Sequence, residues 1–262
     1  MTRGTQLAIL LAVTAAAAVG ISLAPRIPQD PAYHRFADSR PLGMVPNGWN
    51  VLSNLAFLLV GGYGVLKTLE MPAGPTAGFI ESRERWPYAL FFAGVTLTGI
   101  GSAYYHWAPD TPRLFWDRLP MTIGFMAFLA AVVSERIGVT AGLLLLGPLV
   151  AAGASSVIFW RAGELHGAGD LRFYALVQFL PALLILFMLW QFPARYTGGG
   201  SLLVVLGIYA GAKLFEALDG TIFSWGHWLS GHTLKHLAVA LAAWWVVHAL
   251  ETRHATAMEE RT

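Results

Sequence analysis

Residues 172 to 192 read RFYALVQFLPALLILFMLWQF, and Arg172 is the only charged residue in this stretch. A hydrocarbon core of about 30 Å is crossed by roughly 17 to 25 apolar residues in helical conformation. Because lipid offers no partners to backbone polar groups, an uninterrupted run of this length favours an α-helix over a barrel strand. The stretch therefore predicts a membrane-spanning helix.

The rest of the chain repeats this pattern. Comparable apolar runs occupy residues 7 to 24, 49 to 67, 86 to 106, 119 to 134, 139 to 160, 201 to 218 and 231 to 250. The separators are short and contain glycine and proline, so neighbouring helices should pack antiparallel. With 56% hydrophobic and 12% charged residues, the 262-residue chain has too little polar surface to coat a water-soluble globule. We predict an all-α, multi-pass protein of the lipid bilayer, with a seven-helix transmembrane core and one leading N-terminal helix.

The predicted spans divide the chain into four segments: a leading transmembrane or signal-like segment at 1–24, an extramembrane loop at 25–48, the seven-helix core at 49–250 and a polar tail at 251–262. The leading segment fits either an uncleaved span, which we favour, or a signal peptide, because Arg3 precedes an Ala-rich apolar run. Both interpretations put the N-terminus of the core outside and its C-terminus in the cytoplasm. Lys and Arg are divided almost equally between the two sides, so the positive-inside rule gives little help.

Composition also limits the chemistry. The net charge is +2, without the basic clustering that nucleic-acid binding needs, so no nucleic-acid partner is expected. The chain has no cysteine, which excludes disulfides, thiolate metal sites and cysteine nucleophiles. A transition-metal site must therefore be built from histidine and carboxylate.

Two histidines open the last predicted span, in the sequence SGHTLKH at residues 230 to 236. His232 and His236 are four residues apart, just over one helical turn, so both rings share a face. Two imidazoles on one face can clamp a metal, and catalytic zinc typically takes three protein ligands and leaves the fourth position to water. By itself such a pair is equally typical of two unrelated polar residues at a membrane interface. A third ligand is needed.

His106 is the best candidate for the third ligand, because it ends a span on the membrane side where the last span begins. Ser102 lies one turn before it, on the same face. Asp117 follows after a turn with prolines and can return to the same pocket, where a carboxylate is costly unless it is paired or functional. Asp117 can also cap the N-terminus of its helix, with Leu119 and Pro120 following.

Taken in order, the pattern S-x-x-x-H at 102 to 106, the run DRLPM at 117 to 121 and H-x-x-x-H at 232 to 236 resemble the alkaline ceramidase family. That family lies within a wider superfamily that includes progestin and adiponectin receptors. The sequence WNVLSN at 49 to 54 is also similar to the family's opening helix, and the resemblance covers about residues 36 to 250. It implies seven transmembrane helices, Zn²⁺ held by three histidines and a catalytic serine and aspartate beside the metal. In this sequence those residues are His106, His232, His236, Ser102 and Asp117.

The resemblance implies a hydrolase that cleaves the amide bond of ceramide-like N-acyl lipids in the bilayer, releasing a fatty acid and a sphingoid-type amine. Zinc activates water near neutral pH. Asp117 is expected to take the water's proton and pass it to the leaving amine, while Ser102 stabilises the oxyanion. Eukaryotic members carry an acidic calcium site before the first core span. This chain has Asp38 but Asn47 where an acid would precede the WN motif, which argues against Ca²⁺ binding.

Two other classes of protein are compatible with the sequence. A receptor-like or regulatory seven-helix membrane protein would use the zinc site with little or no hydrolysis, and a structural site of this kind is closed rather than open to water. A transporter or a haem-binding electron carrier would need histidine pairs on two facing spans, and it would leave Ser102 and Asp117 unexplained.

Further polar residues within the spans have more than one interpretation. Lys213 and Glu216 are three apart, which predicts an internal ion pair, and Lys235 is expected to reach outward to the interface. Asp219 is interpreted as a capping or solvated residue. The polar residues of the first core span either support the metal ligands or join helices by hydrogen bonds; they are Asn50, Ser53 and Asn54.

Overall fold

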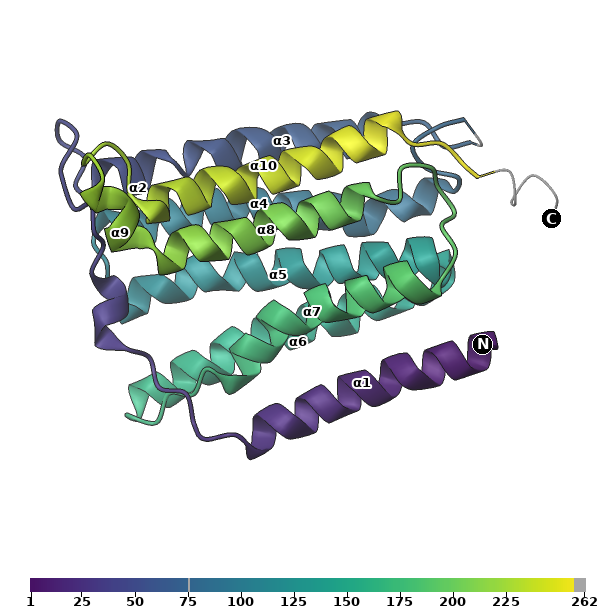
Figure 1. Ribbon diagram of the computed structural model, residues 1–262, viewed down its shortest axis with the longest axis horizontal. Coiled ribbons are helices and arrows are strands. Elements are labelled where there is room, and N and C mark those ends of the chain that lie inside the picture. The colour runs from purple at the N-terminus through teal and green to yellow at the C-terminus, as the bar shows by residue number, and fades with distance from the viewer. Residues whose placement is uncertain (75, 257–262) are drawn as a thin grey trace.

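The protein is a bundle of helices that run lengthwise side by side, as its computed structural model shows for residues 1–74 and 76–256 (Figure 1). The α-helices are α1 (Arg3–Leu23), α2 (Gly48–Leu52), α3 (Leu55–Glu70), α4 (Arg85–Trp107), α5 (Thr111–Arg136), α6 (Val139–Leu165), α7 (Arg172–Gln191), α8 (Ser201–Ala217), α9 (Asp219–Ser224) and α10 (Gly231–Thr252). Short 3-10 helices lie at η1 (Pro31–His34) and η2 (Ser82–Glu84). The described residues form no strand beyond isolated bridges. The all-α fold of a multi-pass membrane protein is thus confirmed.

The predicted number of spans needs correction. Among the described residues, the helices long and apolar enough to cross a membrane number six: α1, the continuous pair α2 and α3, α5, α6, α7 and α10. Helices α4 and α8 occupy the other two predicted spans, at 86–106 and 201–218, but they do not meet this requirement. Helix α8 has only 17 residues, and glycine, threonine and tyrosine make α4 less apolar. Both lie within the bundle beside the six (Figure 1).

The helices alternate in direction, so the ends that carry the predicted site residues meet. Helix α4 finishes, and α5 and α10 begin, at the end of the bundle where α2 and α9 lie (Figure 1). The N-terminus of α1 and the C-terminus of α10 lie at the opposite end (Figure 1). The prediction that His106 and His232 share one end of the bundle is therefore confirmed. Which end faces the cytoplasm stays a prediction.

Helix α5 begins at Thr111, before the predicted apolar run at 119–134, and this start excludes Asp117 from the N-terminus of the helix. The Asp110 side chain caps the helix by accepting a hydrogen bond from the Arg113 amide at 2.7 Å, and a proline follows in the first turn. Asp117 is the seventh residue of α5, well inside the helix, so the alternative that it caps the helix is wrong. Its carboxylate therefore needs another explanation.

A close helix crossing brings α4 against α5. Gly101 lies where an added Cβ would overlap the Trp116 carbonyl, and a Cβ on Gly94 would lie 2.9 Å from the backbone of Gly124. Because these positions carry no side chain, the two backbones approach closely, as small residues permit in membrane bundles. Ser102, next to Gly101, thereby comes to the side of α5 that carries Asp117.

Buried charges tie the opposite end of the bundle together. Arg253, directly after α10, forms an ion pair with Glu135 at the end of α5, and Tyr196 donates a hydrogen bond to Glu84 at 2.7 Å. The predicted polar tail at 251–262 thus begins with helical residues and a buried arginine. Its residues 257–262 lie outside the described part of the chain.

Candidate metal centre and adjoining cavity

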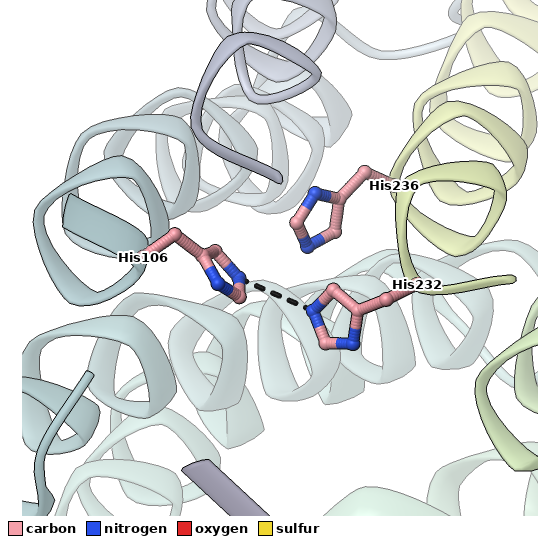
Figure 2. Close-up of side chains that lie close together, drawn as sticks. All are labelled: His106, His232 and His236. Atoms are coloured by element: carbon pink, nitrogen blue, oxygen red, sulfur yellow. Dashed lines mark hydrogen bonds between the residues drawn. The ribbon is translucent and has the colours of Figure 1, made fainter. Parts of the chain in front are cut away.

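Three histidine rings converge where α4 ends and α10 begins. His106 comes from one side and His232 and His236 from the other, with the rings turned toward a common point (Figure 2). Their ring centroids are 4.8 to 5.0 Å apart, and one nitrogen of each ring lies within 4.8 Å of the others. All three side chains are at most 5% exposed. The predicted triad is thus assembled as a buried cluster that can hold a metal ion.

The spacing of His106 and His232 fits two ligands of a tetrahedral metal ion. The Nε2 atoms of His106 and His232 are 3.2 Å apart. Zinc binds histidine nitrogen at about 2.0–2.1 Å, which places two tetrahedral ligands roughly 3.3 Å apart. The Nδ1 atom of His106 is buried and has no hydrogen-bond partner among the described residues. Burial of an unpaired polar atom costs free energy, and a residue that bears this cost is typical of a functional site. Neutral imidazoles are suitable ligands for zinc, copper, iron or nickel.

Ser53, which directly follows α2, orients the ring of His236. The Ser53 hydroxyl lies 2.7 Å from His236 Nδ1 and 3.2 Å from the Asn50 carbonyl, to which it donates. If His236 Nδ1 carries the proton, it donates a hydrogen bond to the Ser53 hydroxyl. The lone pair of Nε2 is then free to bind a metal, as in most metal-binding histidines. Asn50 accepts a hydrogen bond from Thr233 on α10 at 3.1 Å. Of the two roles that the sequence leaves open for these residues, Ser53 supports a ligand and Asn50 joins two helices.

The loop before α2 closes the cluster. Phe36 packs on both His106 and His232, with ring centroids 4.7 and 4.6 Å away. Asp219 accepts hydrogen bonds from the His232 amide at 2.7 Å and from the Ala37 amide at 3.0 Å, so it links the first turn of α10 to the loop. The N-cap of α10 itself is Ser230, so Asp219 joins two segments and does not cap its own helix. No pattern in the sequence predicts the role of Phe36, because nothing local links this loop residue to the distant helix ends.

Ser102 and Asp117 lie beside the triad and are not ligands in it. Their side chains are 2% and 9% exposed, and both line a cavity that His236 also lines. The Ser102 hydroxyl lies within hydrogen-bonding reach of the Asp117 carboxylate. The predicted serine and aspartate are thus brought to the same cavity as one of the histidines.

The cavity has a volume of about 390 Å³ and two chemically different ends. Its deep part lies between aromatic and aliphatic residues of the core, namely Phe91, Phe128, Ile185, Val205 and Ala242. Polar residues gather at the other end, beside the histidines: Gln29, Tyr33, Ser102, Asp117, Arg118 and Lys235. Ligand pockets of about 300–1,000 Å³ that are mainly apolar with a few polar groups are typical of small-molecule sites.

Lys235 differs from its prediction. It does not reach outward to the interface but lines the cavity, where its Nζ donates to Glu216 at 2.9 Å. Glu216 also forms an ion pair with Lys213, so that predicted pair is confirmed and extended by a second lysine. A buried lysine with a carboxylate partner costs less than one alone, which explains why Lys235 turns inward.

Asp38 and Asn47, which precede the first core helix, form contacts within the protein. Both carboxylate oxygens of Asp38 accept hydrogen bonds from Arg40 at 2.8 Å. Burial raises the pKa of Asp38, but the hydrogen bonds and charge of Arg40 outweigh it and hold that pKa below its usual value. The Asn47 side chain donates to the His106 carbonyl at 2.9 Å. Asn47 therefore helps to hold the C-terminal end of α4.

No model of a known protein family matches the sequence, and no curated protein sequence matches it either. The resemblance to the alkaline ceramidases therefore rests on the site residues themselves.

Proposed function

We propose that the protein is a zinc-dependent hydrolase of the alkaline ceramidase type, which cleaves the amide bond of ceramide-like N-acyl lipids within the membrane. The observation that carries this proposal is the shared cavity: a buried histidine triad, a serine and an aspartate meet at the polar end of a largely apolar pocket. A simple structural metal site would need neither the two additional polar residues nor the cavity. In this proposal the fatty acyl chain occupies the apolar part of the cavity, and its amide then lies near the triad.

A zinc ion held by the triad would act as a Lewis acid and lower the pKa of water. Asp117 is then placed to accept the proton of the attacking water as the new bond to the carbonyl carbon forms. Ser102, on the adjoining face of α4, is placed to donate a hydrogen bond to the oxyanion that develops. When the carbon–nitrogen bond breaks, Asp117 returns the proton to the amine. The products are a fatty acid and a sphingoid-type amine.

The experiment combines metal analysis of the purified full chain with fatty-acid release from a panel of N-acyl lipids that includes ceramides. We expect one zinc ion per chain and hydrolysis of at least one amide. His232→Ala should lose both zinc and hydrolysis, because it removes a ligand. Asp117→Asn should keep zinc and lose hydrolysis, because the amide cannot accept the proton.

Two matched controls separate these roles from general damage. His248→Ala removes an exposed histidine from the far end of the same helix, and Glu70→Gln changes an exposed carboxylate at the far end of the bundle. Both should keep zinc and activity. A chain that binds zinc but hydrolyses no amide lipid would instead favour the receptor-like class, and a chain that binds no metal would reject the site.

A further inference from the structure

Arg118 occupies an unusual position at the polar end of the cavity. Its side chain is 4% exposed and lies against three aromatic faces, with the guanidinium carbon 4.5 Å from the ring centre of Trp160, 4.8 Å from that of Tyr174 and 5.3 Å from that of Tyr33. Such faces hold the planar cation in place. They cannot replace the hydrogen bonds that its N–H groups make in water.

The guanidinium is also incompletely satisfied. Its Nη1 atom is buried, and the described residues offer it no hydrogen-bond acceptor. Gln29 lines the same cavity, and its buried Oε1 atom has no hydrogen-bond donor in the part of the chain that the structure describes. An unmet buried donor or acceptor costs about 1–3 kcal/mol, and more for a charged group. Two unmet polar atoms of opposite kind in one cavity indicate a ligand that completes both.

From these contacts we infer that Arg118 recognises an acidic group on the amine side of the substrate, so that the preferred substrates are N-acyl lipids whose amine bears a carboxylate or a similar anion. This inference rests on the proposed function and narrows its substrate class.

The position of Arg118 along α5 fixes which part of the substrate it meets. Asp117 and Arg118 are adjacent and point in different directions, yet both line the cavity. With the acyl chain in the apolar depth and the scissile amide at Asp117, the group attached to the nitrogen extends toward the polar end. There Gln29 Oε1 can accept a hydrogen bond from a donor on that group, while Arg118 binds the anion.

Charge favours an anion over a neutral acceptor. The neighbouring Asp117 carboxylate attracts the guanidinium electrostatically, but Arg118 Nη1 still has no acceptor among the described residues. An anionic ligand would supply that acceptor and a second negative charge, whereas a neutral oxygen would supply only the acceptor. Lys235 differs in this respect, because Glu216 already pairs with it. Hydrogen bonds between a guanidinium and a carboxylate are charge-assisted and are about twice as strong as neutral ones.

The test compares two probes of nearly equal size, N-oleoylglycine and its neutral analogue N-oleoylglycinamide. Their binding to the zinc-loaded full chain in detergent is measured by calorimetry, and their hydrolysis by oleate release. We expect the wild type to bind the acid about tenfold or more tightly than the amide. Arg118→Gln should abolish this preference, and zinc binding at the wild-type stoichiometry shows that the variant is folded.

Arg113→Gln is the matched control, because Arg113 lies on the same helix but pairs with Asp110 at the surface. It should keep the preference. Arg118→Lys retains the positive charge but lacks the planar guanidinium, so this variant should keep part of the preference for the acid. Equal binding of both probes by the wild type would overturn the inference, and so would a preference that survives Arg118→Gln, since the metal itself would then hold the carboxylate.

The two proposals fail in different ways. If the acid is preferred through Arg118 but neither probe nor any ceramide is hydrolysed, the binding site stands and the proposed hydrolase function falls. If both probes are hydrolysed with the same kcat/KM and bound equally, the hydrolase stands and the role of Arg118 falls.

Discussion

Substitution of Ser53 by alanine tests how the metal ligands are held. The Ser53 hydroxyl is 7% exposed and is the hydrogen-bond partner of His236 Nδ1, at 2.7 Å. Without it, His236 loses the group that fixes its tautomer and ring orientation. Loss of such a supporting partner typically lowers metal affinity by about 10- to 100-fold, which corresponds to about 1.4–2.7 kcal/mol.

The affinity is measured by competition between the purified protein and a chromophoric zinc chelator. Ser134→Ala is the control, because Ser134 is also buried but its hydroxyl donates to the Ala130 carbonyl of its own helix, at the opposite end of the bundle. At saturating zinc, Ser53→Ala should recover most of its hydrolytic activity. Unchanged zinc affinity in Ser53→Ala would refute the reasoning, because the ring of His236 would then be oriented by packing alone.

Two further changes test the scaffold around the site. Gly101→Val should lower stability by about 1–3 kcal/mol and reduce hydrolysis, because the new side chain would force α5 away from α4 at Trp116 and displace Asp117. Thermal unfolding and activity of the purified variant measure these effects. Unchanged stability and activity would contradict the close crossing of the two helices. Arg40→Gln removes the cation that keeps the pKa of Asp38 low. A carboxyl group whose pKa is depressed in the folded state stabilises the fold at pH values above its unfolded pKa of about 3.9. This stabilisation is lost as the pH falls through the folded pKa. The Tm difference between wild type and Arg40→Gln should therefore be present at pH 7 and shrink in acid, and a difference that is independent of pH would show that Arg40 acts by packing.

The sequence by itself determined the helical bundle and the local part of the site. Long apolar runs in lipid leave the backbone no alternative to helices, so the positions of the long helices follow from composition along the chain. His232 and His236 share a face because one helical turn separates them, and this local rule needs no tertiary information. Counting the alternating spans was enough to bring His106 to the same end.

Tertiary structure decided everything that depends on contacts between distant segments. Helices α4 and α8 lie in the bundle although neither meets the criteria of length and apolarity for a span of its own, because packing against neighbours compensates for what length and composition do not provide. Lys235 turns inward because Glu216 of α8 offers it a partner, which no pattern within α10 could reveal. The support of His236 by Ser53 and the aromatic surroundings of Arg118 have the same origin. A side chain's direction depends on which distant groups complete its hydrogen bonds and charge, and only the packed bundle places those groups.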